Sequence, residues 1–137
     1  MNIRELIEQF FLIFNNKNRQ IGTFEQACEL FIPEAQIIRY DNCATHNSDY
    51  QVMDLSSFLK PRLQMLSDGT LSKFREWQLE SETQVDGALG YHRCRYQKSG
   101  LLHGKDYQGQ GTKYFSLVKL DDNWKISSII WQDSELG

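Results

Sequence analysis

The chain has 137 residues, of which 40% are hydrophobic and 24% charged, so it is typical of a globular protein and not of a disordered one. This length predicts one domain over residues 1–137. The net charge of −3 argues against a nucleic-acid partner, and no apolar run is long enough for a membrane span. The three cysteines show no CxxC spacing and indicate no disulfide framework, so we expect a cytoplasmic protein.

The first predicted element is an amphipathic helix near the N-terminus. Asn2 and Glu5 have the spacing of a capping box. The apolar residues that follow recur with helical spacing and form one face: Ile3, Leu6, Ile7, Phe10, Phe11 and Phe14. This pattern predicts a helix with one buried side.

Two more helices are predicted before residue 70. Thr23 and Gln26 mark the start of a short helix, which Pro33 stops. A short extended segment follows at AQIIRYD, residues 35–41. The stretch DLSSFLKPRLQML keeps helical spacing of its apolar residues across Pro61, which predicts a kinked third helix.

From Leu71 onward the apolar period changes from 3.6 to 2, which predicts strands. Asp86-Gly87 is a typical hairpin turn, KSGLLHG is a longer connection, and LDDNW closes the last hairpin. The four predicted strands cover residues 72–85, 88–98, 109–120 and 123–133. The predicted fold class is therefore α+β, with three helices followed by four main strands of a curved antiparallel sheet.

Several short motifs resemble the nuclear transport factor 2-like superfamily. They are Tyr96 with Ser99-Gly100, the pair Gly109 and Gly111, the run Trp124 to Ser127, and Trp131 with Asp133. The opening LIEQFFLIFNN and the segment FIPEAQIIRYDN are similar to the N-terminal half of that superfamily, so the resemblance covers essentially the whole chain. It is strongest to uncharacterised bacterial stand-alone members, including SnoaL-like proteins.

The resemblance implies a cone in which a curved sheet wraps around the N-terminal helix and an apolar cavity opens at one end. Relatives include ketosteroid isomerases, polyketide cyclases, scytalone dehydratases and limonene epoxide hydrolases, while others only bind or associate proteins. The fold therefore does not decide the function. The resemblance also implies a homodimer formed through the outer face of the sheet.

The side chains that face the cavity are predicted from strand parity. In 88–98, burying Arg93 and Arg95 is costly, so the even-numbered residues should point inward, among them His92 and Tyr96. In 109–120 the even residues, including Tyr114, are expected to pair with this inward set. This leaves Phe115 and Leu117 on the outer face as the expected interface.

The other two long strands are assigned in the same way. In 72–85 the odd set, with Trp77, is expected inward because the even set carries three glutamates. In 123–133 the residues expected inward are Ile129, Trp131 and Asp133.

Three residues are candidates for proton transfer: His92, Asp41 and Asp133. An imidazole titrates near neutral pH, and a carboxylate in an apolar mouth has a raised pKa. Asp41 lies near the position where ketosteroid isomerase-like relatives hold an aspartate. Arg39 is the alternative at that position, and a cation there would bind an anion or a carbonyl.

The remaining candidates form a ligand-binding wall. Arg39 and an aromatic set are expected to line the cavity: Trp77, Tyr96, Tyr114 and Trp131. The histidines lack metal-ligand spacing, so no metal and no cofactor are expected. Cys43 and His46 lie in a loop that offers no oriented base for a nucleophile.

These observations leave two functions open. One is a protein that binds a small hydrophobic or amphipathic ligand, either without catalysis or as a cofactor-independent isomerase, dehydratase or cyclase. The other is a non-catalytic module that forms dimers or binds proteins. The sequence does not decide whether the protein is an enzyme, and a cavity of several hundred Å³ near His92 would favour the first function.

Overall fold

The structure is a computed structural model that describes residues 1–41 and 49–134. The predicted loop residues Cys43 and His46 lie outside the described residues. The helices and strands follow each other in the order α1 (Ile3–Ile13), α2 (Phe24–Cys28), β1 (Phe31–Asp41), β2 (Asp49–Met53), α3 (Leu55–Ser67), β3 (Leu71–Asp86), β4 (Leu89–Leu102), β5 (Lys105–Leu120) and β6 (Asn123–Ser134).

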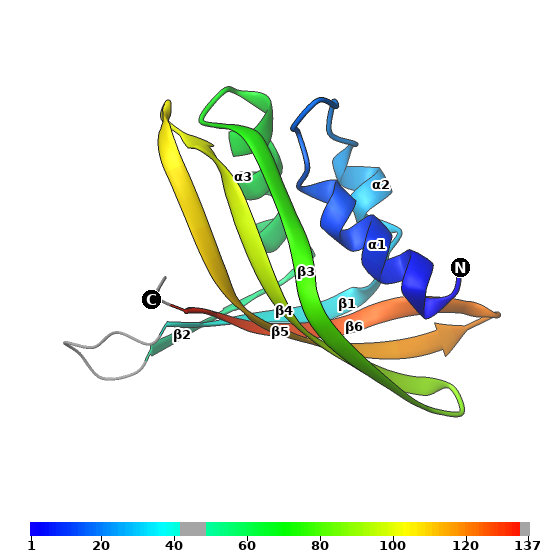
Figure 1. The fold of residues 1–137 in the computed structure, drawn as a ribbon. Helices are drawn as coiled ribbons and strands as arrows, with labels where there is room; N and C mark the ends of the chain where they lie inside the picture. The colour runs from blue at the N-terminus through cyan, green and yellow to red at the C-terminus, as the bar shows by residue number, and fades with distance from the viewer. Residues whose placement is uncertain (42–48, 135–137) are drawn as a thin grey trace.

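One strongly curved sheet carries the helices on its concave side (Figure 1). Its strand order is β2-β1-β6-β5-β4-β3. All neighbouring strands are antiparallel except β1 and β6, which are parallel. The expectation of a purely antiparallel sheet was therefore wrong for this one pair. The predicted α+β cone is confirmed, with β2 as an additional strand at one edge.

The predicted caps stabilise the helix starts. The Asn2 side chain accepts a hydrogen bond from the amide of Glu5, and Thr23 and Gln26 form a complete capping box. Helix α3 continues through Pro61, as predicted. It lies on the concave side of the sheet, where it packs against α2, β1, β2 and β3 (Figure 1).

Phe10 of α1 lies at the centre of the core. Its ring makes edge-to-face contacts with Phe11, Phe14, Phe31 and Phe115 at centroid distances of 5.0–6.3 Å. Burial of these rings is the main source of stability for packing α1 against the sheet. Phe31 belongs to β1 and not to the short helix, because that helix ends at Cys28.

Strand parity in β5 is opposite to the prediction. Phe115 and Leu117 are 1% and 2% exposed and face the core, whereas Tyr114 is 48% exposed on the outer face. The prediction was wrong because the inward residues of β4 pair with odd residues of β5, such as His92 with Phe115, and Lys113 on the same face is itself buried. Phe115 and Leu117 therefore cannot form the expected outer patch.

Parity in β3 also differs from the prediction, and a bulge between Gln78 and Glu80 explains it. Before the bulge, Phe74 and Glu76 are buried; after it, Thr83 lies against the buried His92. A bulge moves the inward set from even to odd residues, so a single parity fails for the whole strand. The assignments for β4 and β6 are confirmed, since His92, Tyr96, Ile129 and Trp131 are all buried.

Candidate functional site

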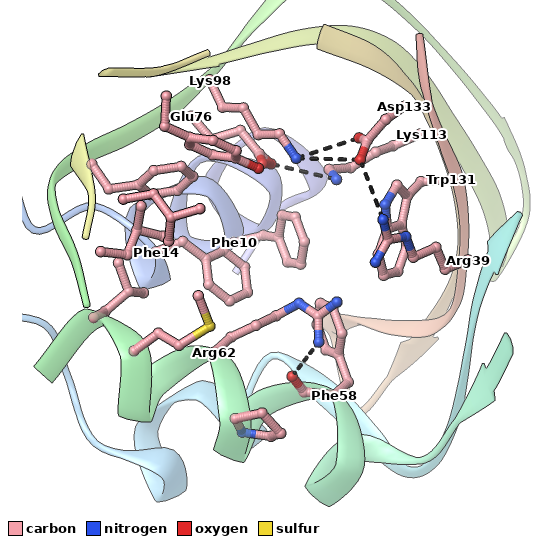
Figure 2. Close-up of a pocket in the computed structure, with 17 residues that line it drawn as sticks. Phe10, Phe14, Arg39, Phe58, Arg62, Glu76, Lys98, Lys113, Trp131 and Asp133 are labelled. Carbon is pink, nitrogen blue, oxygen red and sulfur yellow. Dashed lines mark hydrogen bonds and ion pairs between the residues drawn. The ribbon is translucent and has the colours of Figure 1, made fainter. Parts of the chain in front are cut away.

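A cavity of about 300 Å³ lies between α1, α3 and the concave face of the sheet (Figure 2). Both the helices and the strands supply apolar side chains to its wall, and all of its charged residues except Arg62 come from the strands. The lining residues are Phe10, Phe14, Arg39, Phe58, Pro61, Arg62, Met65, Leu66, Leu71, Phe74, Glu76, Lys98, Leu102, Tyr107, Lys113, Trp131 and Asp133. A partly open cavity of mixed character can hold a small amphipathic molecule.

Arg62 of α3 is the most unusual charge in this cavity. Its guanidinium lies 4.6 Å from the ring centroid of Phe58 and 5.4 Å from that of Trp131, and Nη1 donates a 3.0 Å hydrogen bond to the Phe58 carbonyl. Within residues 1–41 and 49–134, no carboxylate forms an ion pair with Arg62. Burial therefore lowers the pKa of Arg62.

Lys113 of β5 and Glu76 of β3 form a buried ion pair in the same cavity. The Nζ–Oε2 distance is 3.4 Å, and each side chain is 8% exposed. The ammonium group also lies 4.0 Å from the ring centroid of Tyr96 and 4.9 Å from that of Trp131. Burial lowers the pKa of Lys113 despite the opposing effect of Glu76.

Asp133 of β6 connects three other groups at the mouth of the cavity (Figure 2). It accepts a short hydrogen bond from the Tyr96 hydroxyl, both of its oxygens lie 3.4 Å from Lys98 Nζ, and Arg39 approaches to 3.9 Å. Burial raises the pKa of Asp133, but the lysines and the Tyr96 hydroxyl outweigh this and lower it overall. Asp133 is therefore held as a carboxylate.

Two glycines in β5 allow this network to form. Gly111 pairs with Tyr96 on one side and Asp133 on the other, and a Cβ at Gly111 would collide with the Tyr96 hydroxyl and the Gln132 carbonyl. A Cβ at Gly109 would come within 2.6 Å of the Lys98 side chain. The Gly-x-Gly motif thus lets two side chains of β4 cross β5 toward β6.

Three of the residues predicted from the sequence line the cavity: Arg39, Trp131 and Asp133. Tyr96 lies behind the wall, fully buried, where its hydroxyl holds Asp133 and its ring contacts Lys113. The open choice between Arg39 and Asp41 has an answer. Arg39 lines the cavity, while Asp41 is half-exposed and pairs with Arg39 at 3.2 Å.

His92 is buried as predicted, but it is not among the residues that line the cavity. Its Nδ1 lies 2.7 Å from the Thr83 hydroxyl and its Nε2 lies 2.6 Å from Gln78 Oε1. Burial lowers the pKa of His92, which favours a neutral ring with both nitrogens satisfied.

The two other aromatic residues also lie away from the cavity. Tyr114 points to the outer face, which corrects the prediction that it lines the site. Trp77 stacks on Arg75 at 4.1 Å and borders a separate hollow next to α1.

Four charged residues of the site were not predicted from the sequence: Arg62, Glu76, Lys98 and Lys113. Charged side chains were expected to point outward, which holds around a closed apolar core but not around a polar cavity. A usable signal was the pattern around Phe115 and Leu117, which places Lys113 on the same face.

Among the described residues, no group of histidine, cysteine or acidic side chains could hold a metal ion. None of the described helices is long and apolar enough to cross a membrane.

No protein-family profile matches the sequence, and a comparison with curated protein sequences gives no significant match. Solved structures show the fold. A nuclear transport factor 2-like superfamily protein from Salmonella enterica superposes with a TM-score of 0.73 at 14% identity, covering 98% of this chain and 91% of that one. A putative calcium/calmodulin-dependent kinase II association domain from Exiguobacterium sibiricum has a TM-score of 0.73 at 9% identity and covers 98% and 92%.

A third structure carries an enzyme name. It is a putative scytalone dehydratase from Novosphingobium aromaticivorans, with a TM-score of 0.70, 12% identity and coverage of 97% of this chain and 82% of that one. At such identities the likeness shows a nuclear transport factor 2-like fold and nothing about substrate.

Proposed function

We propose that the protein binds a small hydrophobic organic acid in the cavity, with the carboxylate of the ligand against Arg62. The observation that carries this proposal is the half-buried guanidinium of Arg62 on the cavity wall, which forms no ion pair with a carboxylate of the described residues. A charge that is partly removed from water without an ionic partner is costly, so a ligand carboxylate there would supply a charge-assisted hydrogen bond.

The balance of charges in the cavity supports the same ligand class. Four cationic side chains line the cavity: Arg39, Arg62, Lys98 and Lys113. The lining contains two carboxylates, and each is paired with a lysine: Asp133 with Lys98 and Glu76 with Lys113. A concave site with excess positive charge attracts anions.

The apolar part of the ligand would pack against the helices. Phe10, Phe14 and Phe58 form this wall, together with Met65 and Leu66. A volume of about 300 Å³ is at the lower end of ligand pockets, which suits a molecule with one aromatic ring.

In the enzymatic version of this proposal, the cavity supports a cofactor-independent isomerase, dehydratase or cyclase. Asp133 is the expected proton-transfer residue that lines the cavity. Its pKa is lowered and not raised as expected, so it is ionised but a weak proton acceptor. The dehydratase name of one structural neighbour is compatible with such a role.

The test compares 4-methylbenzoate with 4-methylbenzamide, which have the same ring and differ in charge. We expect calorimetry to show saturable binding of the acid and at least about tenfold weaker binding of the amide, a difference of about 1.4 kcal/mol. Arg62→Gln should weaken binding of the acid by a similar factor. Arg75→Gln is the matched control, because Arg75 stacks on Trp77 outside the cavity.

Two results would overturn the proposal. One is equal affinity for acid and amide. The other is unchanged binding of the acid by a folded Arg62→Gln variant.

A further inference from the structure

Lys113 places a primary amine in the wall of the cavity, inside an aromatic enclosure. Cross-strand pairing sets it between Cys94 and Trp131, and its Nζ lies over the rings of Tyr96 and Trp131 at 4.0 and 4.9 Å. Figure 2 shows this amine directed into the hollow, across from Arg62. The only carboxylate within 4.0 Å of Nζ among the described residues is that of Glu76.

The two lysines of the cavity differ in their surroundings. Lys98 has both oxygens of Asp133 at 3.4 Å. Burial alone would lower the pKa of Lys98, but Asp133, Tyr107 and Glu76 raise it overall, so Lys98 stays charged. Lys113 is buried more deeply, and burial lowers its pKa. The neighbouring Lys98 charge acts in the same direction as burial. A neutral amine is therefore more accessible at Lys113 than at Lys98.

We propose that Lys113 is a nucleophile that forms a reversible imine with an aldehyde or ketone group of the organic acid bound in the cavity. This inference rests on the proposed function, because Arg62 would hold the ligand carboxylate while the carbonyl carbon meets Nζ across the hollow. The ligand class is thereby narrowed to oxo acids, which carry an aldehyde or ketone besides the carboxylate.

The reaction needs no further reagent. The neutral amine attacks the carbonyl carbon, a proton moves from nitrogen to oxygen, and a carbinolamine forms. Loss of the former carbonyl oxygen as water, with the two hydrogens of the amine, leaves the C=N bond. Glu76 lies 3.4 Å from Nζ and is placed to move the proton between nitrogen and oxygen.

The experiment traps the imine in the whole protein. The protein is incubated at pH 7 with 4-formylbenzoate and sodium cyanoborohydride, which reduces an imine to a stable secondary amine. Intact mass spectrometry then counts the adducts and peptide mapping locates them. We expect one dominant adduct on Lys113, formed faster than on any other lysine by at least about tenfold, because the cavity would hold the carbonyl group next to this amine.

Competition and variants complete the test. An excess of 4-methylbenzoate, which has no carbonyl group beyond its carboxylate, should suppress the adduct on Lys113 but not the slow labelling of surface lysines. Lys113→Arg should lose the dominant adduct, whereas Lys105→Arg, which changes an exposed lysine outside the cavity, should keep it. Because the peptide map of the unaltered protein already locates the adduct, the result does not depend on the folding of either variant.

Labelling that is spread over surface lysines, with Lys113 unmodified, would contradict the proposal that Lys113 forms an imine. If 4-methylbenzoate still binds in calorimetry, the proposed function survives that result and only the inference on Lys113 fails. If neither 4-methylbenzoate nor 4-formylbenzoate binds, both fail.

Discussion

Lys113 and Glu76 face each other at 3.4 Å inside the protein, and each side chain is only 8% exposed. They come from β5 and β3, which are not neighbours in the sheet, so the pair spans the intervening strand β4. A buried ion pair is expensive to form in place of apolar packing. Its position on the cavity wall is better explained by a ligand than by stability.

Removing one partner of this pair should be strongly destabilising. Glu76→Gln leaves the Lys113 ammonium buried without a carboxylate, so we expect the free energy of unfolding at pH 7 to fall by about 3 kcal/mol. Urea unfolding followed by circular dichroism measures this. The double variant Glu76→Gln/Lys113→Met should recover most of the loss, because it removes the unpaired charge. A double variant as unstable as the single one would contradict this account of the pair.

Replacing Arg62 with an apolar side chain should instead raise the free energy of unfolding. Arg62→Met keeps an unbranched side chain between Phe58 and Trp131 but removes a half-buried charge that forms no ion pair with a carboxylate of the described residues. We expect the free energy of unfolding to rise by about 1 kcal/mol while affinity for 4-methylbenzoate falls. Thermal unfolding and calorimetry on the same samples measure both quantities. A clear loss of stability would show that Arg62 serves the fold instead of a ligand.

His92 should make stability depend on pH in the mildly acidic range. Burial lowers its pKa in the folded protein below 6.5, so the unfolded chain binds the proton first as pH falls. The contribution of His92 to stability should therefore be constant above about pH 7 and decrease below pH 6.5, by at most about 1.4 kcal/mol per pH unit for one proton. Urea unfolding at pH 7, 6 and 5 tests this.

Two comparisons make the origin of that slope identifiable. His92→Gln should flatten it, whereas His103→Asn, at an exposed turn position with positive φ, should not. The NMR titration of His92 should also be unaffected by 4-methylbenzoate, because His92 does not line the cavity. A ligand-dependent shift of that titration would instead return His92 to the proton-transfer role first considered for it.

The fold was predictable because its signals are local and mutually consistent. Apolar spacing in residues 3–14, the caps at Asn2 and Thr23, and the Asp86-Gly87 turn each predicted an element that the structure contains. Strand β2 was missed because the five-residue stretch Asp49–Met53 is short and lacks an alternating pattern.

The site was only partly predictable because it breaks the rule that places charge outside. Lys113 is charged but buried, whereas β5 was predicted in the opposite orientation, with Lys113 outside and Tyr114 in the cavity. Trp131 and Asp133 were correctly placed, although both alternating sets of β6 contain apolar residues and the pattern alone did not decide between them. A polar cavity stabilises buried charges through partners from distant strands, and such partners cannot be read from one strand at a time.

The expected homodimer is still a prediction, but the residues that would form it have changed. Val52, Ile130 and Tyr114 are 45–49% exposed. With Ile38 they form a continuous row on the outer face, across β2, β1, β6 and β5. A twofold axis would pack this row against its own copy. Ile130→Lys should therefore shift the protein from dimer to monomer in sedimentation velocity, because it would bury two unpaired charges in such an interface. Leu89→Lys, exposed at the β3–β4 hairpin and outside the row, should leave the dimer intact. A wild-type protein that sediments as a monomer at every concentration would rule out the dimer.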